Sequence, residues 1–129
     1  MPHFIVEYTD NLRAEGRISE LLAKANAVMR AQDGVFPLGG IRCRAIEVRD
    51  YFIADGEDDY AFVHAHLKIG PGRAEAEITK ALDELFTMMR EHFAPLFEKR
   101  YLALSMEFTE FGKHSRYRHN NLHTRFKEG

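Results

Sequence analysis

Hydrophobic positions along the chain change their spacing from two residues to three or four, and then back to two. Residues 3–8, HFIVEY, are mostly β-branched or aromatic and contain no breaking residue, which predicts a strand. Residues 17–34 place apolar side chains at helical spacing and end at Gly34, a typical helix stop. Residues 41–54 alternate again and are rich in β-forming side chains, so we expect a second, long strand there. The first part of the chain therefore predicts one strand–helix–strand (βαβ) unit.

The same order of patterns repeats after the polar turn DGEDD. Residues 60–69 alternate with a period of two and predict a third strand, which the glycine loop GPGR follows. Residues 74–100 carry an apolar stripe at helical spacing, with a proline near the end, where a kink or a stop is tolerated. Residues 101–111 alternate once more and predict a closing strand.

The two units predict one duplicated α/β (α+β) domain that covers residues 1–129. The halves are about 2–54 and 60–110, and each supplies two strands and one helix. We expect a four-stranded sheet with both helices on one face. Because the strands are apolar at alternate positions, we expect the other face to expose an apolar patch that further subunits would cover. The pattern therefore favours an oligomer.

The last segment, residues 112–129, differs in character from the rest of the chain. It is rich in lysine, arginine and histidine and poor in apolar residues, which is typical of an arm rather than of a core element. Composition leaves two interpretations open, an arm that wraps a neighbouring subunit and a disordered tail.

Composition argues against several classes of protein. The 129 residues carry a formal net charge of -2, which gives no reason to expect a nucleic-acid partner. The single cysteine rules out an internal disulfide framework. The apolar runs are too short to span a bilayer, and Glu7 interrupts the apolar start of the chain, unlike a secretory signal. We therefore expect a cytoplasmic protein with no membrane partner.

Pro2 is the first candidate for chemistry. Removal of Met1 would turn its ring nitrogen into a free secondary amine. Burial and nearby cations lower the pKa of such an amine toward neutral pH, where it can act as a general base. The alternative is an ordinary proline at the entrance of a strand, and Pro2 alone does not decide between the two.

Three arginines strengthen the first interpretation. Arg42 and Arg44 lie two residues apart in GGIRCR on a predicted strand, so their side chains leave the same face. Arg73 follows the glycine loop GPGR and precedes a predicted helix, where a guanidinium and helical N–H groups can bind one anion. Each could also be a surface arginine paired with an acid. Together with a terminal amine, they favour a site for carboxylates.

Other chemical candidates are weaker. His64 and His66 share a strand face, but no third ligand is evident, so we interpret them as hydrogen-bonded strand residues and expect no metal. Cys43 lies between two arginines, but alternation turns it away from them, which predicts a packed thiol.

Four segments in this order, PHFIVEYTDN, FPLGGIRCR, ADGEDDYAFVHAHLKIGPGR and LALSMEFTE, resemble the 5-carboxymethyl-2-hydroxymuconate isomerase family of the tautomerase superfamily. The resemblance covers most of the chain and is weakest in the first helix and the arm. It implies a duplicated βαβ tautomerase-type subunit assembled as a homotrimer, with an amino-terminal proline as the catalytic base and no cofactor.

The resemblance also implies roles for particular residues. By motif, Pro2 is the base, Arg42 and Arg73 bind substrate carboxylates, and the role of Arg44 stays open. The implied substrate is 5-carboxymethyl-2-hydroxymuconate, an anionic dienol from bacterial breakdown of homoprotocatechuate, and the product is its unsaturated 2-oxo isomer. This chemistry requires the loss of Met1, because the Pro2 nitrogen is an amide while methionine is attached.

Two other functions remain open at this point. The first is another tautomerase-superfamily activity, such as a phenylpyruvate-type tautomerase or a dehalogenase, and for a dehalogenase Glu7 or Glu107 would be the candidate carboxylate. The second is a non-catalytic oligomer that binds anionic metabolites. Retention of Met1 in the native protein would favour the non-catalytic alternative.

Overall fold

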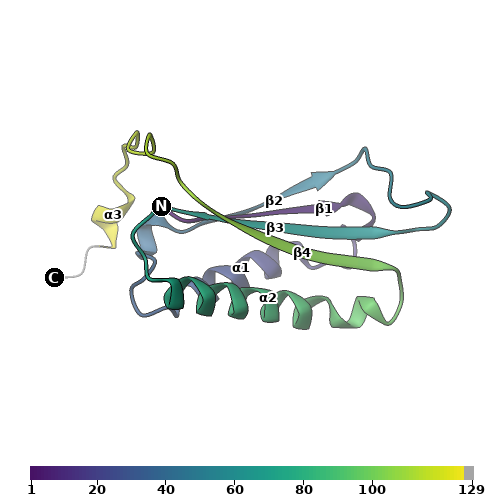
Figure 1. The fold of residues 1–129 in the computed structure, drawn as a ribbon. Coiled ribbons are helices and arrows are strands. Elements are labelled where there is room, and N and C mark those ends of the chain that lie inside the picture. The colour runs from purple at the N-terminus through teal and green to yellow at the C-terminus, as the bar shows by residue number, and fades with distance from the viewer. Residues whose placement is uncertain (127–129) are drawn as a thin grey trace.

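Two βαβ units lie next to each other in one four-stranded sheet (Figure 1). The computed structural model describes residues 1–126. The first unit consists of β1 (His3–Thr9), α1 (Ile18–Arg30) and β2 (Arg42–Val48). The second consists of β3 (Ala61–Ile69), α2 (Glu75–Phe97) and β4 (Leu102–Glu110). The described chain also forms three short helical turns, η1 (Asp10–Leu12), η2 (Leu38–Gly40) and α3 (Leu122–Arg125).

The strand order is β2-β1-β3-β4. Strands within each unit are parallel, and the two units meet through the antiparallel pair β1 and β3. Each parallel pair is joined by a helix that crosses over the sheet, and both helices cross over the same face (Figure 1). The predicted four-stranded sheet with two helices on one face is therefore confirmed.

The core lies between the sheet and the two long helices. On this face every second side chain of the central strands is fully buried: Phe4 and Val6 from β1, and Val63 and Leu67 from β3. They pack against the apolar stripes of α1 and α2, which include Leu21, Met29, Leu85 and Phe93. Burial of this apolar surface is the main favourable contribution to folding, and it fixes the position of the strand ends that carry the site.

The second strand is shorter than predicted. β2 ends at Val48, because its partner β1 ends at Thr9, which lies directly opposite Val48 in the register. Residues 49–60 form an irregular connection without that partner, and the Tyr51 hydroxyl donates instead to Asp10 Oδ1 at 2.9 Å. The prediction of a strand over residues 41–54 is therefore wrong beyond Val48, since alternation continues in the sequence after the pairing has ended.

The uncovered sheet face carries both polar and apolar side chains, rather than the continuous apolar patch that the pattern predicts. That face of β3 and β4 carries polar side chains that bond to one another across the strands. His64 Nδ1 lies 2.6 Å from Ser105 Oγ, and His64 Nε2 lies 2.6 Å from Glu107 Oε2. Phe62 of β3 and Ala103 of β4 lie on the same open face, whereas the other apolar members of both strands point to the helices. This part of the sheet therefore offers only a small apolar surface to another subunit.

The arm takes a third arrangement, beside the two that composition left open. Residues 112–126 fold back to the end of the sheet where the chain begins, and α3 lies next to η2 (Figure 1). The last three residues of the predicted arm, 127–129, lie outside the described part of the chain. Within residues 1–126, none of the helices is both long and apolar enough to cross a bilayer.

Candidate active site

A basic cavity of about 650 Å³ opens at the amino-terminal end of β1. Three segments line it: the η2 loop with Pro37 and Gly40, the glycine loop with Gly70 and Arg73, and the arm. Met1 also lines it, whereas none of the lining residues within the described chain is acidic. A cavity of this composition attracts anions.

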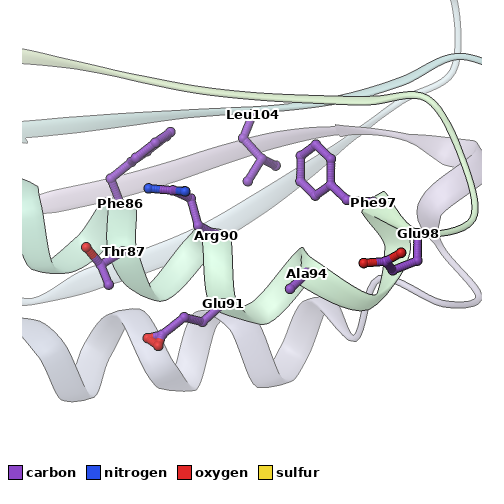
Figure 2. Close-up of a pocket in the computed structure, with 8 residues that line it drawn as sticks. All are labelled: Phe86, Thr87, Arg90, Glu91, Ala94, Phe97, Glu98 and Leu104. Atoms are coloured by element: carbon purple, nitrogen blue, oxygen red, sulfur yellow. The ribbon is translucent and has the colours of Figure 1, made fainter.

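A second hollow of similar size lies elsewhere and has a different character. It occupies about 720 Å³ between α2 and β4, where Phe86, Phe97 and Leu104 turn toward the space above the helix and Glu91 turns away from it (Figure 2). It contains none of the candidate residues from the sequence. The basic cavity is therefore the candidate active site.

Pro2 is buried at the edge of the basic cavity. Its carbonyl oxygen accepts a hydrogen bond from the Arg42 backbone N–H at 2.9 Å. A Cβ added to Gly40 would lie 3.4 Å from Pro2 Cδ, so the η2 backbone passes close to the proline ring. The parallel register, with His3 opposite Arg42, produces this arrangement by setting the start of β2 beside the start of β1.

The terminal amine in this structure belongs to Met1, and the Pro2 nitrogen is an amide. Burial lowers the pKa of the Met1 amine below its ordinary value, and the positive charges of Arg73, Arg118 and Arg42 lower it further. These groups therefore set the electrostatic potential at the chain start, one residue before the predicted base.

Arg73 is held rigidly at the wall of the cavity. Its Nε donates to the Val35 carbonyl at 3.0 Å, and its Nη1 donates to the Gly70 carbonyl at 3.1 Å. The guanidinium carbon lies 5.2 Å from the centre of the Phe36 ring. Within residues 1–126, Nη2 donates to no protein acceptor, so this side of the guanidinium is available to a ligand.

Arg42 and Arg44 leave β2 on the same face, as alternation predicts, but they have different surroundings. Arg42 Nη1 donates to the Gly39 carbonyl at 2.8 Å, which keeps the side chain beside η2 and Pro2. Arg44 Nη1 lies 3.0 Å from His3 Nδ1, on the exposed sheet face, and Arg44 lines neither the basic cavity nor the small one beside it. Arg42 does not line either cavity, but its charge, like that of Arg73, acts on the terminal amine, whereas Arg44 is not among the charges that lower the pKa of that amine.

The arm supplies cavity residues that the sequence did not single out. Lys113, Arg116, Arg118 and His123 all line the basic cavity. A smaller cavity of about 180 Å³ lies next to it, and Met1 and Arg118 line both. The basic composition of the arm was visible in the sequence, but its return to the chain start was not, because an irregular segment has no periodicity that reveals its path.

Other candidates lie outside this site. Cys43 points toward the helices, and burial raises the pKa of its thiol to about 11, as expected of a packed thiol. His66 Nε2 lies 2.7 Å from Thr109 Oγ1 on the open face. Among residues 1–126, no group of three or more histidine, cysteine, aspartate or glutamate side chains is arranged to hold a metal ion. Glu7 and Glu107 also lie on the open face, so neither lines the cavity.

The duplicated βαβ topology is the fold of the tautomerase superfamily. A solved structure of a fused 4-OT protein, described as a symmetric trimer, matches it with a TM-score of 0.64 and 15% identity over 85% of this chain and 87% of that one. At this identity the match concerns the fold alone.

More specifically, the chain belongs to the 5-carboxymethyl-2-hydroxymuconate isomerase family, whose sequence model matches residues 2–126. It is 46% identical to a 5-carboxymethyl-2-hydroxymuconate Delta-isomerase of Escherichia coli, over 98% of this chain and 100% of the relative. A crystal structure of a 5-carboxymethyl-2-hydroxymuconate isomerase from Deinococcus radiodurans R1 superposes with a TM-score of 0.93 and 44% identity, over 98% and 95% of the two chains. The protein is therefore an isomerase.

Proposed function

We propose that this chain, once Met1 is removed, converts 5-carboxymethyl-2-hydroxymuconate to its unsaturated 2-oxo isomer through the amino group of Pro2. The observation that carries the proposal is the position of Pro2 beside a cavity without acidic lining residues, next to Met1, whose amine feels the charges of Arg73 and Arg42. The substrate named for the relatives is a polyanion, and such a cavity suits it.

The surroundings of the chain start favour an unprotonated amine. Burial and the three arginines that lower the pKa of the Met1 amine would act in the same direction on a Pro2 amine, because the two nitrogens are separated by one residue. A secondary amine that is neutral near pH 7 can accept a proton and return it, which is the requirement for a single acid–base residue.

The reaction then needs one proton and no oxidant. The Pro2 nitrogen removes the proton of the 2-hydroxyl group, and the electron pair moves into the conjugated system. Carbon 5 receives a proton from the Pro2 ammonium, and carbon 2 with its oxygen becomes the carbonyl group of a ketone. Arg42 and Arg73 hold carboxylates and stabilise the charge that spreads toward them, more strongly in the dienolate than in the substrate. No cofactor takes part in this scheme.

The proposal includes a pathway and an assembly. The substrate would come from the breakdown of homoprotocatechuate, and the enzyme would work as a homotrimer. Support for the trimer comes from the fold neighbour described as a symmetric trimer. The two edge strands, β2 and β4, each have one side without a partner strand in this subunit, and such edges can pair with another copy.

The deciding experiment compares two forms of the protein. The form that begins at Pro2, verified by mass spectrometry, should convert the muconate, followed by the change in its ultraviolet absorbance. A form with an extra residue before Pro2 should bind the substrate but show a loss of turnover of about 10³-fold or more, since its Pro2 nitrogen is an amide. A Pro2→Ala variant, which keeps a terminal amine, serves as the intermediate control. Equal rates for the blocked and free forms would exclude proline catalysis.

The alternatives fit the cavity less well. A dehalogenase needs a carboxylate that activates water near the amine, and the candidates Glu7 and Glu107 lie on the open sheet face. A phenylpyruvate-type tautomerase handles a single carboxylate and would leave several cations of this cavity without a role. A non-catalytic anion-binding oligomer would be favoured if Met1 were retained in the protein isolated from its own cell.

A further inference from the structure

The arm is fixed to the site by a close contact that leaves no room for side chains. A Cβ added to Gly39 would lie 3.0 Å from both Cα and Nδ1 of His123. A Cβ added to Gly40 would lie 3.5 Å from His123 Cε1 and 3.4 Å from Pro2 Cδ. The His123 ring and the Pro2 ring therefore flank the same short stretch of η2. The arm therefore packs against the η2 backbone, and the Gly39 carbonyl of that backbone accepts the hydrogen bond from Arg42.

This contact between His123 and η2, the seat of the arm, places Arg118 next to the chain start. Arg118 lines the larger and the smaller cavity, and in both it shares the wall with Met1. Among residues 1–126, its guanidinium forms no salt bridge, in contrast to Arg100 near the opposite end of the sheet, which pairs with Asp59 at 3.1 Å. The Arg118 charge also acts on the terminal amine more strongly than that of Arg42 does. Arg118 thus lies in the wall of the cavity at the chain start, with no ion-pair partner among residues 1–126.

The proposed substrate carries one carboxylate more than Arg42 and Arg73 can each bind. Muconate is a dicarboxylate, and the carboxymethyl group adds another carboxylate. Arg42 and Arg73 can each bind one of them as a charge-assisted pair. The remaining carboxylate needs a further cation on the opposite wall, and the arm provides that wall.

We propose that Arg118 binds a carboxylate of the substrate, and that the arm is the element by which this enzyme selects polycarboxylate enols over monocarboxylate ones. The inference rests on the proposed function for the identity of the reaction, but binding of the polyanion can be tested independently of it. Met1 lines both cavities, so its loss would enlarge the space beside Arg118.

The test uses the full chain beginning at Pro2 and three variants. Arg118→Ala removes the proposed contact, and Arg118→Lys keeps the charge without the fork of donors. Arg125→Ala is the matched control, because Arg125 belongs to the same arm, stacks on Phe126 and lines neither cavity. Calorimetry with propane-1,2,3-tricarboxylate and with butanoate measures binding without turnover, and steady-state kinetics with the muconate measures KM and kcat.

We expect Arg118→Ala to weaken binding of the tricarboxylate about 10-fold or more and to leave butanoate binding unchanged. KM should rise by a similar factor with a smaller change in kcat, Arg118→Lys should recover part of the loss, and Arg125→Ala should match the wild type. A wild-type affinity for the tricarboxylate in Arg118→Ala would overturn the inference. Absence of muconate turnover in the wild type would instead refute the proposed function, and the calorimetry would still decide the role of Arg118.

A further variant tests the seat of the arm. Gly39→Ala inserts a methyl group where His123 now lies, and it keeps the residue 39 carbonyl that accepts from Arg42. It should reproduce the weaker tricarboxylate binding of Arg118→Ala while the circular dichroism of the fold is retained. A folded Gly39→Ala protein with wild-type affinity would show that α3 does not position Arg118, and this part of the inference would be wrong.

Discussion

Arg73 has two proposed roles, ligand binding and control of the amine pKa, and the second can be tested by itself. The positive charge of Arg73 is the largest electrostatic influence that lowers the pKa of the terminal amine, after burial. Arg44 has the same charge but does not contribute to that lowering, because it lies on the sheet face next to His3. The two arginines therefore form a matched pair for a pH study.

In the processed enzyme, Arg73→Ala should shift the acidic limb of the pH profile of kcat/KM toward higher pH. Removal of a nearby cation raises the pKa of the Pro2 amine, so the amine stays protonated, and inactive as a base, up to a higher pH. A shift of roughly half a unit to one unit is expected. Arg44→Ala should leave the limb unchanged, and an equal shift in both variants would contradict the assignment.

At the level of residues, the sequence predicted the positions but not the contacts. Alternation correctly placed Arg42 and Arg44 on one strand face and turned Cys43 to the other. It could not tell which of the two arginines would reach Pro2, because that depends on the register between β1 and β2 and on the path of η2. Arg118 lay outside any regular element and was missed for the same reason.

Among the elements, α2 is tied to the first half of the chain through His92. This side chain is 2% exposed, its Nε2 lies 2.8 Å from the Gly16 carbonyl, and its Nδ1 lies 3.1 Å from Lys24 Nζ. Because the lysine donates to Nδ1, the imidazole is neutral with its proton on Nε2. Burial lowers the pKa of His92, and the nearby charges of Arg17 and Lys24 lower it further.

His92 should therefore make the stability of the fold depend on pH. Its pKa is lower in the folded chain than in the unfolded one, so the unfolded chain binds the proton more readily. The contribution is fully present above the unfolded pKa of about 6.5 and decreases as the pH falls through the folded value. The urea midpoint of the wild type should drop between pH 7 and pH 5. His92→Gln should lower the midpoint at pH 7 and flatten this dependence, whereas His114→Gln, in the arm, should retain it.

The helices and strands were predictable where the hydrophobic periodicity of a segment agrees with its pairing or packing in the fold. Both long helices and all four strands lie where their patterns indicate, because each carries an apolar face that the other layer covers. β2 was too long in the prediction, since alternation reports the preference of a segment and not the presence of a partner. Pro95 stays within α2, close enough to its end to be tolerated.

For the whole molecule, the prediction concerns the assembly, which we propose to be a homotrimer. Light scattering should give a mass about three times that of the 14.9 kDa chain. Ile46, 48% exposed on the edge strand β2, should lie in the contact between subunits, and Ile46→Lys should produce monomers. Phe52→Lys is the control, because Phe52 is 80% exposed but lies in the connection after β2. A trimer that tolerates Ile46→Lys would place the contact elsewhere.

At this scale the sequence predicted the layers but not the surfaces. The polar network of His64, Ser105 and Glu107 interrupts the expected apolar patch, because most of the apolar positions of β3 and β4 belong to the core. The arm could not be placed at all from the sequence, since its location depends on the fit of one histidine against two glycines.

The seat of the arm has a practical consequence for anyone who purifies or immobilises this protein. Met1 and residues of the arm line one cavity, so an affinity tag before Pro2 would crowd the proposed active site. The connection after β2 projects from the opposite end of the sheet, and its residues 55–59 are exposed. A label, a surface anchor or a split-reporter insertion therefore belongs in that connection, at the other end of the sheet from the chain start (Figure 1).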